Sequence, residues 1–151
     1  MKKILFVCHG NICRSPMAES VMTFLAGELG AEVSVASAAT SYEEIGNPPH
    51  RGTVKVLREE GIPLIPHRAV RMTKDDYEKY DLLVGMDSAN IRNMRSICGG
   101  DPRGKISRLL DWTGSGRDVA DPWYTGNFDE TYWDIDRGCR ALLKALREGQ
   151  A

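Results

Sequence analysis

The run Ile4-Leu5-Phe6-Val7-Cys8-His9-Gly10-Asn11-Ile12-Cys13-Arg14-Ser15-Pro16 contains the main determinants of the architecture. Its first four residues are apolar and rich in strand formers, which is typical of a short buried parallel strand. Gly10 and Asn11 are residue types that tolerate unusual turn dihedrals, and Ser15 followed by Pro16 predicts a helix N-cap with proline in the first helical position. The run therefore predicts a strand, a tight loop and a helix in immediate succession.

The predicted loop has the features needed to hold a tetrahedral dianion. Its backbone N–H groups, the positive end of the helix dipole and the guanidinium of Arg14 would all point at one small volume, with Cys8 at its floor. The pKa of a free cysteine is about 8.5, but it can fall by several units at a helix N-terminus beside a cation. We therefore expect this loop to bind phosphate and to attack it through the Cys8 thiolate.

The arrangement of Cys8, five intervening residues, Arg14 and Ser15 directly after the first strand resembles the low-molecular-weight protein tyrosine phosphatase family. Near the C-terminus, Asp121-Pro122-Trp123-Tyr124 is similar to the Asp-Pro and aromatic pair of that family. Two further segments are similar to family motifs, namely His67-Arg68-Ala69 and Met86-Asp87-Ser88-Ala89-Asn90. The length and the motif order also agree, so the resemblance covers nearly the whole chain.

The resemblance implies three catalytic residues that meet the needs of phosphate ester hydrolysis. Cys8 would attack phosphorus, while Arg14 and the loop amides would hold the equatorial oxygens. Asp121 would protonate the leaving phenolate and then activate the water that hydrolyses the cysteinyl-phosphate intermediate. No metal and no cofactor is implied. The implied phosphate-binding residues are His9, Gly10, Asn11, Ile12, Cys13, Arg14 and Ser15.

Supporting roles also follow from the resemblance. Ser15 would donate a hydrogen bond to the thiolate, and Asn11 would maintain the shape of the loop. Ser37 and His67 would support the loop from behind by hydrogen bonding. Cys13 would protect the nucleophile reversibly against oxidation.

The segment 42–51 departs from the family pattern. Related phosphatases usually have an aromatic residue followed by Asp-Pro-Arg here, whereas this chain has Tyr42-Glu43-Glu44 and later Pro49-His50-Arg51. Its glycine, asparagine and prolines predict a loop that forms one wall of the site. We expect that Tyr42 replaces the aromatic wall or that Glu43 makes the mouth more acidic.

The opposite wall is predicted to contain Trp123 and Tyr124. With His9 and Ile12 they would flank a slot of a depth suited to a phenyl phosphate rather than a shorter seryl phosphate. Aromatic residues beside a proline can also be ordinary packing residues, which is the alternative reading.

Composition and charge restrict the possible classes of protein. The chain has 151 residues, 42% of them hydrophobic, which predicts a single domain over residues 1–151 with a substantial core. A formal net charge of −1 provides no general attraction for nucleic acid or anionic membranes. The four cysteines form neither a disulfide framework nor a zinc motif, so we expect a reducing cytoplasm. The N-terminal apolar run is too short for a signal peptide, and no segment is long enough to span a membrane.

Strand and helix signals alternate along the chain. They predict strands over residues 4–7, 32–36, 81–86 and 105–110, and helices over 16–29, 52–60, 73–80 and 88–97, with a last helix from Asn127. The expected caps are Thr73, Asp87 or Ser88, and Asn127 with Glu130 as a capping-box partner. This order predicts an α/β fold with a four-stranded parallel, doubly wound, Rossmann-like sheet and helices on both faces. Ligands of such sheets bind beyond the carboxyl ends of the strands. The loops after the first and the last strand would converge there and bring Cys8, Arg14 and Asp121 together.

Two alternative activities belong to relatives with a similar fold. A protein-arginine phosphatase is similar throughout, but it typically has threonine where this loop has Ile12, and it lacks the paired aromatic residues. A thiol-dependent arsenate reductase needs two further cysteines close together in sequence, whereas Cys98 and Cys139 are far apart. Both comparisons favour a phosphotyrosine phosphatase.

Two other classes would use the cysteines differently. A phosphocarrier protein would accept phosphate on Cys8 but would need neither Arg14 nor Asp121, and a thiol oxidoreductase would pair Cys8 with Cys13. The presence of all three implied catalytic residues favours hydrolysis. The expected substrates are phosphotyrosine proteins or small aryl phosphates, and the expected state is a monomer or a weak dimer.

Overall fold

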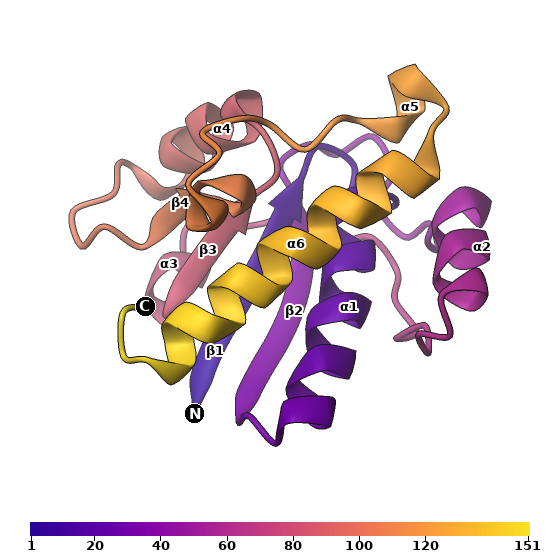
Figure 1. The fold of residues 1–151 in the computed structure, drawn as a ribbon. Coiled ribbons are helices and arrows are strands. Elements are labelled where there is room, and N and C mark those ends of the chain that lie inside the picture. Colours follow the sequence, from indigo (N-terminus) through magenta and orange to yellow (C-terminus); the bar gives the residue numbers. More distant parts are fainter.

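Four parallel strands form the centre of the computed structural model, which describes residues 1–151. The strands are β1 (Lys2–Cys8), β2 (Val33–Ala39), β3 (Leu82–Gly85) and β4 (Ile106–Arg108). They pair in the order β2-β1-β3-β4, as Figure 1 shows. The predicted four-stranded parallel sheet is therefore confirmed.

The helices that connect and cover the strands follow the predicted alternation. They are α1 (Arg14–Leu29), α2 (Arg51–Glu59), α3 (Asp76–Lys79), α4 (Ser88–Cys98), α5 (Pro122–Thr125) and α6 (Phe128–Arg147), with a 3₁₀ helix η1 (Leu109–Thr113). None of these helices combines the length and the apolar composition that a membrane span requires.

Alternate residues of β1 point into two separate cores. Ile4, Phe6 and Cys8 belong to the larger core, which α1, α2 and α6 cover, while Leu5 and Val7 belong to a smaller core under α3 and α4. This is the side-chain alternation of a strand buried on both faces. Because β1 is central in the sheet, its carboxyl end lies between the two layers of helices.

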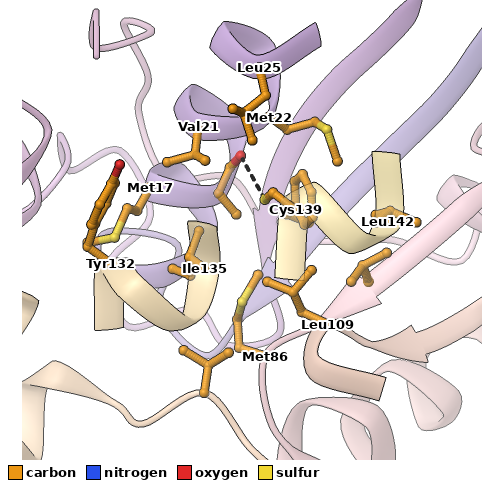
Figure 2. Packing of buried hydrophobic residues seen from close by; sticks show 14 of the residues in the cluster. Met17, Val21, Met22, Leu25, Met86, Leu109, Tyr132, Ile135, Cys139 and Leu142 are labelled. Carbon is orange, nitrogen blue, oxygen red and sulfur yellow. Dashed lines mark hydrogen bonds between the residues drawn. The ribbon is translucent and has the colours of Figure 1, made fainter. Parts of the chain in front are cut away.

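The larger core is built mainly between α1 and α6. Figure 2 shows Met17, Val21 and Leu25 of α1 facing Ile135 and Cys139 of α6. Cys139 has no exposed surface, and its Sγ lies 3.9 Å from the Ala18 carbonyl oxygen. Burial raises the pKa of the Cys139 thiol far above its usual range, so this thiol stays protonated in the core at neutral pH.

Several predicted boundaries and caps are wrong. β2 continues to Ala39, so Ser37 lies in the strand rather than in the following loop, and β4 ends at Arg108 because the next residues turn into η1. Thr73 does not cap α3, whose N-cap is Asp75. Asp87 does cap α4, in a capping box with Asn90.

The last helix has half of its predicted capping box. The side chain of Asn127 accepts from the Glu130 N–H, as expected for an N-cap. In a full capping box the Glu130 side chain would accept from the Asn127 N–H. Here the Asn127 N–H donates to Thr125 Oγ1 instead, at 3.0 Å.

Close packing between α6 and η1 depends on Gly138. A Cβ atom at this position would overlap the side chain of Leu109, which is fully buried. We expect Gly138→Ala to lower the free energy of unfolding by about 1–3 kcal/mol, as overpacking does in a dense core. Denaturant unfolding measures this change.

Gly27→Ala in α1 is the matched control, because nothing lies within 4 Å of a Cβ at that exposed position. It is expected to stabilise the protein by about 0.5–1 kcal/mol through helix propensity. A Gly138→Ala protein as stable as the wild type would contradict the close packing.

Candidate active site

The loop that was predicted to bind phosphate joins the end of β1 to the start of α1. Asn11 has a φ of 59° and is the only residue other than glycine with a positive φ, as expected for a tight turn. This turn directs the Asn11 N–H at Cys8 Sγ, 3.3 Å away. The loop therefore curls around the Cys8 sulfur and presents a backbone donor to it.

The Ser15 side chain contacts Cys8, the predicted nucleophile, instead of capping the helix. α1 begins at Arg14 with Cys13 as N-cap residue, so the predicted N-cap at Ser15 is wrong. Ser15 Oγ lies 3.1 Å from Cys8 Sγ and accepts a hydrogen bond from Asn11 Nδ2 at 2.8 Å. Because Asn11 supplies that hydrogen, the Ser15 hydroxyl can donate its own to Cys8 Sγ.

The Asn11 amide connects the loop to the residues predicted to support it. The Val70 N–H donates to Asn11 Oδ1 at 3.1 Å, which determines the orientation of the amide. His67 Nε2 lies 2.6 Å from the same oxygen and must therefore carry a proton. Asn11 Nδ2 also donates to Ser37 Oγ at 3.0 Å. The structure thus brings Ser37 and His67 to the back of the loop, where they were predicted.

Glu19 completes this network and was not predicted from the sequence. Its Oε1 accepts from Ser37 Oγ at 2.6 Å and lies 3.8 Å from His67 Nδ1. Burial raises the pKa of the Glu19 carboxyl, although the hydrogen bond from Ser37 opposes that shift. Glu19 lies four residues after Ser15, on the same helix face, and this spacing is the signal that would have identified it.

Arg14 is buried at the base of the site, with 2% of its surface exposed. Its Nη1 donates to Asp87 Oδ2 at 2.8 Å and to the Val119 carbonyl at 3.0 Å, and its Nη2 donates to Asp121 Oδ2 at 3.3 Å. Burial opposes the charged form, but the negative charges of Cys8, Asp121 and Asp87 raise the pKa of Arg14. The guanidinium therefore remains charged and held in one orientation.

Asp87 has a second role beside the cap predicted for it. One carboxylate oxygen accepts from the Asn90 N–H at 2.7 Å, and the other accepts from Arg14. Asp87 follows the end of β3, which pairs with β1, so the sheet topology places it next to the loop. Its position after a central strand is the signal for this role.

Asp121 reaches the site from the segment that follows η1. Its backbone is extended, with φ −83° and ψ 113°, as the following proline favours. One carboxylate oxygen accepts from the Trp123 N–H at 3.0 Å, and the other faces Arg14. The loops after β1 and β4 thus converge as predicted, and Cys8, Arg14 and Asp121 line one cavity.

The cavity has a volume of about 190 Å³. Besides the three residues above, its lining includes the predicted loop residues His9, Gly10, Ile12 and Cys13. Its rim is formed by Glu43, Glu44, Trp123 and Tyr124. Asn11 and Ser15 lie behind this lining and act through hydrogen bonds. Glu44 is a rim residue that was not singled out from the sequence.

Tyr42 does not line the cavity, so its predicted role as a wall is wrong. Its side chain is exposed, and the Arg71 guanidinium lies 4.3 Å from the centre of its ring. The Tyr42 ring thus makes a cation–π contact with Arg71, and Tyr42 is absent from the residues that line the cavity. Glu43 does line the mouth, where its Oε2 lies 2.8 Å from His9 Nε2.

Cys13 differs from Cys8 in its surroundings. Burial, and next the charge of Cys8, raise the pKa of the Cys13 thiol to about 12. Cys13 therefore remains protonated at neutral pH. All four cysteines are free in this structure.

Comparisons with known proteins agree with this geometry. Residues 3–151 match the model of the family described as low molecular weight phosphotyrosine protein phosphatase. The chain is 42% identical over 152 residues to the low molecular weight protein-tyrosine-phosphatase YfkJ of Bacillus subtilis, covering 98% of this chain and 97% of that protein. The crystal structure of YfkJ has a TM-score of 0.95 at 41% identity and covers 100% of this chain and 98% of its own.

A second solved structure contains a phosphonate. Vibrio vulnificus Wzb in complex with benzylphosphonate has a TM-score of 0.83 at 30% identity, covering 95% of this chain and 97% of that one. PtpA of Staphylococcus epidermidis, another low molecular weight protein-tyrosine-phosphatase, is 35% identical over 145 residues, covering 95% of this chain and 92% of that protein.

Proposed function

This chain belongs to the low molecular weight phosphotyrosine protein phosphatase family, and we propose that it hydrolyses phosphotyrosine monoesters through Cys8, Arg14 and Asp121. The observation that carries the proposal is the hydrogen bonding of Arg14. A guanidinium has five N–H donors, of which Asp87, the Val119 carbonyl and Asp121 take three. The Nε hydrogen and one Nη2 hydrogen remain as a fork that matches two phosphate oxygens.

The reaction follows from this placement. The Cys8 thiolate forms a bond to phosphorus as the bond to the phenolic oxygen breaks, and Asp121 gives its proton to that oxygen. The Asp121 carboxylate then takes a proton from water, which attacks phosphorus and releases the Cys8 thiolate and phosphate. Arg14 and the loop amides stabilise the equatorial oxygens in both steps.

The walls of the cavity favour an aromatic phosphate. Ile12 contributes an apolar side chain, and Trp123 and Tyr124 stand at the rim on the side of Asp121. A protein-arginine phosphatase remains the alternative, with the same roles for the three catalytic residues. Arsenate reduction is not supported, because Cys98 and Cys139 lie in separate cores on opposite faces of the sheet.

A comparison of two substrates tests this proposal. Phosphate release from matched phosphotyrosine and phosphoarginine peptides, without added metal, is expected to be faster for phosphotyrosine by at least about tenfold. A preference for phosphoarginine would contradict the aromatic slot while leaving the catalytic residues in place. Absence of phosphate release from either peptide would contradict the proposed chemistry.

Other expectations stay predictions. They are reversible protection of Cys8 by Cys13, independence of metals and cofactors, absence of nucleic-acid or membrane partners, and a monomer or weak dimer. No three His, Cys, Asp or Glu side chains are arranged to hold a metal ion. Location in the cytoplasm is supported by four free cysteines.

A further inference from the structure

The segment that delivers Asp121, residues 114–121, forms no helix or strand and is called here the acid loop. It begins with two glycines of positive φ, Gly114 and Gly116, and most of it is exposed. In Figure 1 it crosses the carboxyl edge of the sheet from beside α4 toward α5, above α6. A general acid at the end of such a segment needs other contacts to hold it in reach of the substrate.

One anchor of the acid loop lies on the side of α4 and β4. Asp118 Oδ1 accepts from Arg108 Nη1 at 2.9 Å, from the Ser88 N–H at 3.0 Å and from Ser88 Oγ at 3.1 Å. The next residue, Val119, is buried, and its N–H donates to the Met86 carbonyl at 2.9 Å. These bonds fasten the loop to the ends of β3 and β4.

A second anchor lies on the opposite side, on α6. Arg117 binds Asp134 with both ends of its guanidinium, Nη2 to Oδ1 at 2.6 Å and Nη1 to Oδ2 at 3.0 Å. The Asp134 side chain is only 6% exposed and also accepts from Arg137 at 2.9 Å. One helical turn earlier, Thr131 Oγ1 donates to the Ala120 carbonyl at 3.0 Å.

We propose that the Arg117–Asp134 ion pair positions Asp121, by holding the acid loop on α6 while Asp118 holds it on α4 and β4. Arg117 and Asp118 are adjacent in the chain, and their side chains are bound on opposite sides of the loop. Together the two contacts prevent the loop backbone from rotating about its own axis. That rotation would turn the Val119 carbonyl away from Arg14 and move the Asp121 carboxyl. This inference rests on the proposed role of Asp121 as the general acid.

The test is the dependence of kcat/KM on the leaving group in an Arg117→Met variant. Phenyl phosphate needs a proton for its basic leaving oxygen, whereas the more acidic phenol of p-nitrophenyl phosphate leaves with little assistance. We expect kcat/KM to fall about tenfold for phenyl phosphate and less than about threefold for p-nitrophenyl phosphate. The tenfold loss is smaller than the full contribution of a general acid, because Asp121 is misplaced rather than removed. Because both substrates report on the same folded fraction, a mere loss of stability would lower both values equally.

Arg140→Met is the matched control. Arg140 lies on α6, the helix that carries Asp134, and its guanidinium pairs with Asp136 at 3.0 Å. It forms no hydrogen bond or ion pair with the acid loop. Its removal is expected to leave both kcat/KM values unchanged. Arg117→Met keeps Asp134 paired with Arg137, so the variant is expected to fold, which its melting temperature checks.

A double-mutant cycle identifies the residue through which Arg117 acts. In an Asp121→Asn background, Arg117→Met is expected to cause no further loss with phenyl phosphate, because the group that it positions is gone. The proposal would be overturned if the losses caused by Arg117→Met and by Asp121→Asn multiply in the double variant. It would also be overturned if Arg117→Met alone lowers kcat/KM equally for both substrates. If Asp121→Asn alone affects the two substrates equally, the general-acid role itself fails. If Asp121→Asn is selective for phenyl phosphate and Arg117→Met is not, only the anchor proposal fails.

Discussion

A Cys8→Ser variant is expected to lose phosphotyrosine hydrolysis by a factor on the order of 10⁵, as the removal of a covalent nucleophile does. Ser15 Oγ and the Asn11 N–H lie within hydrogen-bond distance of Cys8 Sγ, and neither group can deprotonate an alcohol placed there. Phosphate release at high enzyme concentration measures the loss.

The same variant is expected to keep its affinity for a nonhydrolysable aryl phosphonate, because Arg14 and the loop remain in place. Calorimetric titration of benzylphosphonate checks this expectation. Cys98→Ser serves as the control, since Cys98 is buried in the smaller core away from the cavity and its replacement should leave activity intact. A Cys8→Ser protein that releases phosphate at the wild-type rate would rule out Cys8 as the nucleophile.

Arg14→Lys is expected to lower kcat/KM by a factor of about 10³, although it preserves the positive charge. Arg14 satisfies Asp87, the Val119 carbonyl and Asp121 and still has two donors left for phosphate. The three donors of a single ammonium cannot hold these partners and also form a planar fork to two phosphate oxygens. Steady-state kinetics with a phosphotyrosine peptide measure the loss.

Asp87→Asn removes the negative charge that pairs with Arg14 while keeping a side chain of nearly the same shape. Its side chain can still cap α4, but it no longer carries the charge that pairs with Arg14. We expect a smaller loss, of about tenfold. If Arg14→Lys retains activity within about threefold of the wild type, positive charge alone is sufficient and the fork is not required.

Prediction from the sequence succeeded where a few neighbouring residues carry the signal. The apolar run before Cys8, the turn at Asn11 and the proline after Asp121 each act through local backbone preferences. The alternation of strands and helices likewise indicates a parallel sheet, because parallel strands need a crossover between them. These signals were sufficient to predict the sheet and the convergence of Cys8, Arg14 and Asp121.

Prediction failed where a distant residue competes for a side chain. Ser15 matched an N-cap, but its hydroxyl is engaged by Cys8 and Asn11. Tyr42 matched a wall of the mouth, but Arg71, far along the chain, holds its ring elsewhere. In both cases the local pattern was compatible with the predicted role, and a tertiary contact selected another.

The sequence by itself determined the order of the elements, the turn at Asn11 and the extended backbone of Asp121, since each depends on bonding and sterics within a few residues. Only the tertiary structure decided how those groups are held. Glu19 and Asp87 were assigned their roles by it, and so were the two anchors of the acid loop at Arg117 and Asp118. The reason is that a charged or hydrogen-bonding side chain can pair with many partners of suitable chemistry. The partner is selected only when folding brings one of them, from a distant part of the chain, within about 3 Å.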